Sequence, residues 1–166
     1  GIVSIDLYGC TALKDISGLG ELKKLLSISI SKGNPYYSHL DNEITKLPIG
    51  FDKIKNLETL DFSYSNLIKD IDSLANCKNL TTLNLQYCTS IQNVNGLKTC
   101  NNLLSVNLDE CESLNNVEGL AYLNNLESLR LSKCKNVKPK PSPVIMDTRE
   151  KVEKFQKRIK NPTKNS

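Results

Sequence analysis

The sequence predicts an α/β fold built as a solenoid, in which short strands stack into one parallel sheet. Three observations lead to this prediction: a segment recurs about every 23 residues, its apolar residues fall in fixed columns, and aromatic residues are few. The chain of 166 residues contains three Phe, six Tyr and no Trp. A stack of aliphatic layers needs less aromatic bulk than a single globular core.

The repeat appears as six copies of an L-x-x-L-x-L core, with an apolar residue at every one of its three apolar positions. The first column holds Ile2, Leu25, Leu57, Leu80, Leu103 and Leu126. The second holds Ile5, Ile28, Leu60, Leu83, Val106 and Leu129, and the third Leu7, Ile30, Phe62, Leu85, Leu108 and Leu131. In L-x-L, both apolar side chains face the same side of a strand, and one strand cannot bury that side alone. Stacked copies bury it against their neighbours, so all eighteen side chains are predicted to point inward.

Further apolar residues follow each core at intervals of three residues, as in Ile91, Val94 and Leu97. This interval is typical of 3₁₀ turns or tight extended segments, whereas full α-helices would need a longer repeat. We therefore expect a parallel sheet on the concave side and short 3₁₀ or extended turns on the convex side.

The pattern L-x-x-L-x-L-x-x-C/N-x-x-L resembles the leucine-rich-repeat family over residues 1–137. The outer I-x-x-L-x-x-L run is similar to internalin-like repeats, and the C-x-x-I step is similar to cysteine-containing repeats. The resemblance implies a right-handed solenoid that binds a protein ligand on its concave face. It also leaves a second reading open, in which the chain is the recognition domain of a larger enzyme, effector or immune-type sensor.

One repeat is longer than the others, because Leu25 and Leu57 are 32 residues apart. The extra residues, 33–41, are expected to leave the end of the second strand as an inserted loop. Tyr36 and Tyr37 in this loop are candidate contacts for a ligand, since interfaces favour tyrosine. The alternative is a structural loop folded back on the solenoid.

The array is predicted to end at Val137, where a Pro/Lys-rich connection, residues 138–146, removes backbone donors. Residues 147–160 are predicted to form an amphipathic helix, with Asp147 as N-cap and an apolar stripe of Val152, Phe155 and Ile159. We interpret it as a cap on the last repeat, with docking of another domain as the alternative. Residues 161–166 are expected to be a disordered tail.

The six cysteines fall in two repeat columns rather than in paired motifs. They are Cys10, Cys88, Cys111 and Cys134 in one column, and Cys77 and Cys100 in the other. Both columns are expected to point inward, and stacked side chains suit disulfide torsions poorly. We predict six buried free thiols, which favours a reducing, intracellular compartment.

Composition and motifs give catalysis little support. His39, the one histidine, lies in the inserted loop, and we find no phosphate-binding loop, nucleophile motif or zinc-ligand spacing. Neither enzymatic activity nor a cofactor or metal is expected, and no apolar stretch is long enough to span a membrane. The chain begins at Gly1 rather than Met, so we expect it to be a fragment.

Acidic and basic residues are distributed unevenly along the chain. Residues 1–132 hold 11 Lys and Arg against 15 Asp and Glu, and residues 133–166 hold 11 against 3. The basic C-terminal region is interpreted as a solvated helix face, with nucleic acid or an acidic membrane as the alternative partner.

The side chains that alternate with the core positions define the candidate binding face. One column contains Asp6, Asp61, Asn84, Asn107 and Arg130, and the positions beyond it contain Tyr8, Tyr64, Tyr87, Asp109 and Glu110. Tyrosines give large contact area at small entropy cost, and the carboxylates beside them favour a protein ligand of basic or mixed charge. Nucleic acid is disfavoured on this face, because its phosphates would meet the carboxylates.

Overall fold

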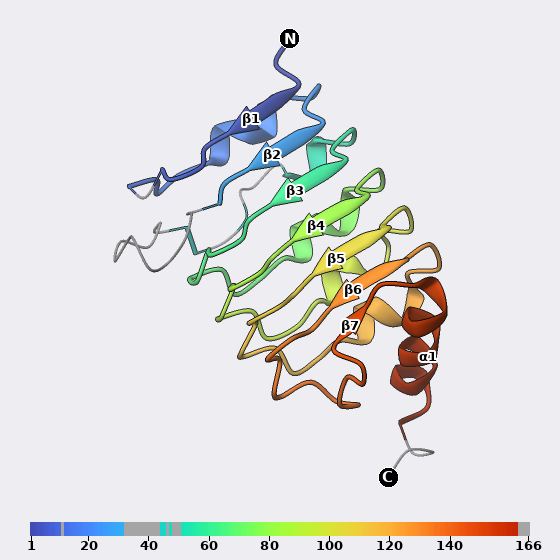
Figure 1. Cartoon of the computed structure of the whole chain (residues 1–166). Coiled ribbons are helices and arrows are strands. Elements are labelled where there is room, and N and C mark those ends of the chain that lie inside the picture. The colour runs from blue at the N-terminus through green and yellow to red at the C-terminus, as the bar shows by residue number, and fades with distance from the viewer. Residues whose placement is uncertain (11, 32–43, 46, 48–50, 163–166) are drawn as a thin grey trace.

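The structure is a computed structural model that describes residues 1–10, 12–31, 44, 45, 47 and 51–162 (Figure 1). Among these residues, seven short strands form one sheet in chain order. They are β1 (Ser4–Asp6), β2 (Ser27–Ser29), β3 (Thr59–Asp61), β4 (Thr82–Asn84), β5 (Ser105–Asn107), β6 (Ser128–Arg130) and β7 (Ile145–Met146). The first six strands are parallel and pair position by position, which confirms the predicted sheet.

Short 3₁₀ turns lie on the far side of the core from the sheet (Figure 1). They are η1 (Ser17–Glu21), η2 (Phe51–Lys53), η3 (Asp72–Asn76), η4 (Asn95–Leu97) and η5 (Glu118–Tyr122). A polar side chain fixes the start of most turns: Asp70, Asn93 and Asn116 each accept a hydrogen bond from the N–H two residues later. Asp and Asn favour such local bonds, which explains their recurrence before these turns. The predicted 3₁₀ turns are confirmed.

The core is a column of layers, one for each repeat. In repeats two to six, all fifteen residues of the L-x-x-L-x-L positions are buried. The outer apolar positions are buried as well, including Ile68, Ile91 and Leu114 in one column. Each layer therefore buries its apolar side chains against the layers before and after it.

The first repeat departs from the prediction. Ile2 is 55% exposed, while Ile5 and Leu7 are only partly buried. The prediction that Ile2 points into a core is wrong, because no described residue covers the outer side of β1. Burial in a solenoid comes from neighbouring layers, and the first described layer has a neighbour on one side only.

The inserted segment, residues 33–41, lies outside the described residues, together with Tyr36, Tyr37 and His39. Its effect on the sheet is nevertheless visible, since β2 and β3 pair with Ser27 opposite Thr59. After the insertion, Ile44, Leu47, Phe51 and Ile54 are buried, as the repeat pattern predicts. The extra residues therefore leave the register of the sheet unchanged.

Buried thiols link consecutive layers. The Sγ atoms of Cys88, Cys111 and Cys134 lie 3.2, 3.2 and 3.0 Å from the backbone carbonyl 26 residues earlier. Cys77 and Cys100 make the same kind of contact on the convex side. Because these thiols bond to the preceding repeat, each stabilises the stacking of two layers.

All six cysteines are free, but only five are buried. Cys10 is exposed, so the prediction of six buried thiols is wrong at this position. The carbonyl that its thiol would meet belongs to a preceding layer, and no described residue supplies one. Burial raises the pKa of Cys88 and Cys134 to about 12 and that of Cys100 to about 11.

The last repeat is covered by two elements. β7 runs antiparallel to β6, with Ile145 opposite Arg130 and Met146 opposite Leu129. The predicted connection, residues 138–146, therefore contains a strand, which its three alternating prolines concealed. β7 buries Met146 against the core.

The helix α1 (Arg149–Lys160) packs against η5 and the end of the sheet (Figure 1). It buries Val152 and Phe155, and Gln156 Nε2 donates to the carbonyls of Leu120 and Leu123 at 2.8 and 2.9 Å. These contacts cover the last layer, as a cap must. The interpretation of residues 147–160 as a cap stays a prediction.

The start of α1 differs from the prediction. Thr148 is the N-cap, and its hydroxyl oxygen accepts a hydrogen bond from the N–H of Lys151 at 3.4 Å. Asp147, the predicted N-cap, forms an ion pair with the Lys151 ammonium at 2.5 Å instead. Asp and Thr are both good N-caps, so the sequence did not distinguish two neighbouring residues.

Candidate protein-binding surface

The solvent face of the sheet, which we call the concave face, carries the predicted polar column from Asp6 to Arg130. Asp61, Asn84 and Asn107 are half-buried, whereas Asp6 and Arg130 at the two ends are exposed. The five side chains belong to β1 and to β3–β6 of one sheet, and Ser29 holds this position in β2. The structure therefore brings this part of the predicted site together.

Folding accounts for the acidic and amide residues of this column. The N–H of the residue two positions later donates to the side-chain oxygen of Asp61, Asn84 and Asn107, at 2.8, 3.1 and 3.0 Å. Asp6 makes the same bond to the N–H of Tyr8 at 2.9 Å. Between strands, Asn84 Nδ2 donates to Asp61 Oδ2 at 3.2 Å. These side chains turn the chain at the strand end and still present one polar edge to solvent.

A second column follows immediately after each strand end, and we call Tyr64, Tyr87, Glu110 and Lys133 the rim column. All four residues have left-handed backbone, with φ between 60° and 64°, and Gly9 takes their place in the first repeat with φ of 73°. For a residue other than glycine this conformation costs roughly 1–2 kcal/mol. The N–H groups of Tyr64, Tyr87 and Glu110 donate to carbonyls of the next repeat at 2.7–2.9 Å, which offsets the cost.

Side chains of the rim column touch one another in sequence. The rings of Tyr64 and Tyr87 stack with centroids 4.7 Å apart and planes 14° from parallel. Tyr87 bonds to the Glu110 carboxylate, which pairs with Lys133 Nζ at 2.5 Å. Burial raises the pKa of the Tyr87 hydroxyl, and the charge of Glu110 raises it further. The rim column is therefore a row of contacting side chains, aromatic at Tyr64 and Tyr87 and charged at Glu110 and Lys133.

Asp109 and Glu110, which the sequence analysis placed on the binding face, are less accessible to a ligand than that placement implies. The side chain of Asp109 is only 4% exposed and that of Glu110 13%. Arg130 Nε donates to Asp109 Oδ2, and the N–H of Ser132 donates to Asp109 Oδ1, each at 2.7 Å. Arg130 cannot accept the turn bond that its column normally makes, so Asp109 of the preceding repeat accepts it instead. What faces solvent here is Arg130 and Lys133.

Of the five tyrosines predicted as ligand contacts, Tyr64 and Tyr87 are brought together in the described part of the chain. Tyr36 and Tyr37 lie outside the described residues. Tyr8 is 63% exposed but belongs to a different column, since Gly9 is the counterpart of Tyr64. The sequence held a signal for this shift: Gly9 stands at the repeat position where left-handed backbone recurs.

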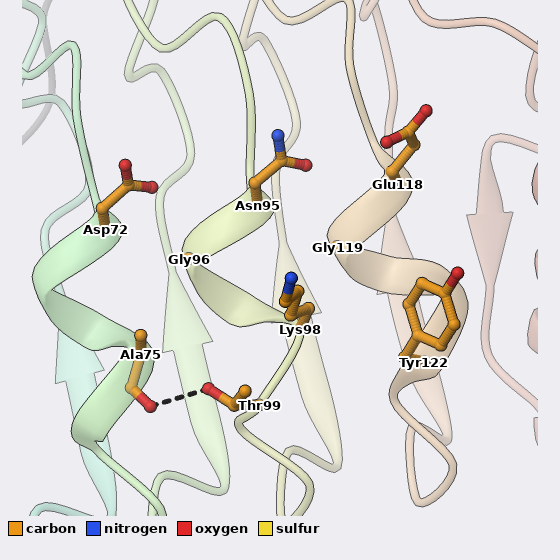
Figure 2. Close-up of a pocket in the computed structure, with 9 residues that line it drawn as sticks. All are labelled: Asp72, Ala75, Asn95, Gly96, Lys98, Thr99, Glu118, Gly119 and Tyr122. Carbon is orange, nitrogen blue, oxygen red and sulfur yellow. Dashed lines mark hydrogen bonds between the residues drawn. The ribbon is translucent and has the colours of Figure 1, made fainter.

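The convex side has a groove across three turns that the sequence analysis did not identify (Figure 2). Its volume is about 690 Å³, and it is lined by Asp72, Ala75, Asn95, Gly96, Lys98, Thr99, Glu118, Gly119 and Tyr122. Thr99 Oγ1 donates to the carbonyl of Ala75 at 2.7 Å across the groove (Figure 2). This bond directs the Thr99 hydroxyl to a backbone carbonyl rather than to a general base, which a hydroxyl nucleophile needs.

Two further features are absent from the part of the chain that the structure describes. It has no group of three or more His, Cys, Asp or Glu side chains that could hold a metal ion. Nor does any described helix have the length and apolar character needed to cross a membrane.

Comparison with known proteins points to one kind of repeat. Residues 55–99 match the family model for leucine-rich repeats, in two copies. A leucine-rich-repeat protein of Leptospira interrogans superposes with a TM-score of 0.61 at 21% identity, covering 81% of this chain and 35% of that one. The leucine-rich-repeat ectodomain of the receptor kinase SOBIR1 from Arabidopsis thaliana gives 0.54 at 19% identity, covering 80% of this chain and 70% of that one. No curated protein sequence matches the chain.

Proposed function

We propose that this leucine-rich-repeat protein is a non-enzymatic binding module whose protein ligand contacts the concave face and the rim column. Solenoids of this kind generally present an extended concave surface to other proteins. The observation that carries the proposal is the stacked pair Tyr64 and Tyr87, which is half-exposed beside the polar column. Left-handed backbone and the bond to Glu110 hold the pair in place, so little entropy is lost when a ligand covers it.

The charges on this surface favour a ligand of mixed charge. Asp6 and Asp61 lie in the strands of repeats one and three, whereas Arg130 lies in the strand of repeat six and Lys133 follows that strand. Asp109 and Glu110 are nearly buried and already paired. A segment lying across the strands would place basic groups near the first repeats and a carboxylate near the last.

We also propose a reducing, intracellular compartment for the domain. The support is chemical: six free thiols occur in one chain, and the five buried ones donate to backbone carbonyls rather than pairing. In an oxidising compartment, an exposed thiol such as Cys10 is open to intermolecular pairing.

The proposal is tested on the tyrosine pair. The double variant Tyr64→Ala with Tyr87→Ala should weaken binding by about 2 kcal/mol or more, as at other hot spots. Affinity is measured by calorimetry against the partner recovered by pull-down. The stack itself contributes about 0.5–1.5 kcal/mol to folding, so the variant is assayed well below its measured melting temperature.

Tyr122→Ala is the matched control, because Tyr122 is an exposed tyrosine on the convex side. We expect it to bind the partner as the unchanged protein does. Deleting residues 34–40 tests the inserted loop separately and should also weaken binding. If both the double variant and the deletion bound the partner with full affinity, the ligand would have to bind another surface.

A further inference from the structure

A second groove lies at the C-terminal end of the molecule, away from the concave face. It runs between the segment around Lys138–Lys140 and the last turn of α1, and its volume is about 650 Å³. It is lined by Asn115, Asn116, Val117, Glu118, Lys138, Pro139, Lys140, Arg158, Ile159 and Pro162. We call it the basic groove, because Lys138, Lys140 and Arg158 face a single carboxylate, Glu118.

The cations of this groove differ from three basic residues in the first half of α1. On α1, Arg149, Lys151 and Lys154 each pair with a carboxylate one turn away. In contrast, no carboxylate of the described residues pairs with Lys138, Lys140 or Arg158. Three neighbouring positive charges without counterions raise the local potential and concentrate anions.

Helix chemistry explains only part of this charge. Arg158 lies in the last turn of α1, where cations interact favourably with the helix dipole, and its Nη2 donates to the carbonyl of Lys140 at 3.0 Å. Lys138 and Lys140 belong to an irregular segment outside any helix, and no described bond uses their ammonium groups. Both lysines are exposed, so their ammonium groups are available to a ligand.

Part of the lining is apolar. Pro139, Ile159 and Pro162 present partly or largely exposed apolar side chains there, whereas Val117 is buried. A ligand that fills this groove must bring both carboxylates and apolar side chains. A peptide segment with interspersed acidic and aliphatic residues has this chemistry.

Other anions fit less well. None of the described residues that line the groove is aromatic, so bases of single-stranded nucleic acid would find no stacking partner there. The Glu118 carboxylate would repel a run of phosphates more than separated carboxylates.

We propose that the basic groove is a second docking site, which binds an acidic peptide segment carrying aliphatic side chains. Lys138, Lys140 and Arg158 hold its carboxylates, and the proline and isoleucine walls receive its aliphatic groups. The site is independent of the concave face, so one ligand on each surface can be bound together.

The test uses the full chain and a fluorescent peptide rich in glutamate with interspersed leucines. Fluorescence anisotropy should show binding that weakens as salt is added, because exposed charges are screened beyond about 10 Å at 0.1 M salt. Lys138→Glu with Lys140→Glu should weaken binding about tenfold or more, since it reverses two charges next to the ligand. Lys138→Gln with Lys140→Gln should give a smaller loss, and it keeps the test valid if the reversed variant fails to fold.

The control is Lys69→Glu with Lys98→Glu, which changes the net charge equally at exposed positions of other repeats. We expect its affinity to change by no more than about twofold, because these charges lie outside the groove. An equal loss in both reversed pairs would overturn the proposal, since overall charge would then be responsible. Equal binding of a peptide with glutamine in place of glutamate would also overturn it. Binding of oligothymidylate or of phosphatidylserine vesicles, without binding of the peptide, would overturn the proposal as well.

Discussion

The first and last repeats of the stack have the same apolar columns, yet they are buried to different extents. At the C-terminal end, β7 pairs with β6, and α1 places Val152 and Phe155 over the last layer. At the other end, Ile2 and Val3 are half exposed, and β1 has a strand neighbour on one side only. In a solenoid, an apolar residue type makes burial of a side chain favourable, but the side chain is buried only where a neighbouring layer covers it.

The same contrast appears in two other columns. Gly96 and Gly119 lie directly against backbone of the preceding repeat, whereas Gly18, their counterpart in repeat one, has open space around its Cα. Cys88 reaches a carbonyl of the preceding repeat, and Cys10 is exposed. In repeat one, Gly18 and Cys10 therefore occupy positions that contact a preceding repeat elsewhere in the stack, but they make no such contact in the structure.

The largest expected difference between the two ends concerns large apolar side chains. Phe155→Ala should lower the free energy of unfolding by about 3–5 kcal/mol, because it empties a buried site between α1 and the last layer. Ile2→Ala should lower it by no more than about 0.5 kcal/mol, since Ile2 is largely in water already. Urea unfolding of both variants measures the two losses. Similar losses would mean that the ends are equally buried in solution.

A smaller difference is expected between two glycines. A Cβ at Gly96 would lie 2.6 Å from the carbonyl oxygen of Ile71 and 2.7 Å from the Asp72 Cα, both of them backbone atoms. Gly96→Ala should therefore destabilise the fold by about 1–3 kcal/mol. At Gly18 nothing lies within 4 Å, so Gly18→Ala should be neutral or stabilise by up to about 1 kcal/mol through the unfolded state. Thermal melts of the pair would contradict this reasoning if Gly18→Ala were the more harmful.

The smallest effect concerns the thiols and is chemical rather than structural. In the native protein Cys10 should react quickly with a thiol reagent while the other five react slowly, and the denatured protein should titrate six. The raised pKa values of Cys88, Cys100 and Cys134 also predict a pH dependence. Above the ordinary thiol pKa, the unfolded chain loses protons that the folded chain keeps, so stability falls as pH rises from about 8.5 towards 11 or 12.

The first half of that prediction is checked by timed mass spectrometry of labelled peptides, which identifies the reactive cysteine. Fast labelling of Cys88 in the native state would contradict the hydrogen bond from its buried thiol to the Phe62 carbonyl. For the pH dependence, urea midpoints are compared at neutral and alkaline pH. A Cys88→Ala variant should show a weaker decline.

Most of the fold could be predicted from residue spacing. The columns through Leu57, Leu80 and Leu103 predicted the strands and their register, and residues 55–99 match the family model for leucine-rich repeats. The candidate site was less accessible to such reasoning. Tyr64 and Tyr87 were chosen as exposed aromatics, yet their stacking and their left-handed backbone follow from contacts between repeats. The function assigned to them stays a prediction.

The sequence alone determined the repeat, the sheet, the 3₁₀ turns and the apolar stripe of α1, because each follows from local spacing within one or two turns of chain. Only the tertiary structure decided which members of a column are covered, as Ile2 and Cys10 show. It also decided that Asp109 is a buried partner of Arg130 rather than a surface charge. The physical reason is common to these cases. Burial and charge pairing depend on the neighbouring layer, and the sequence of one repeat does not show which side chains that layer provides.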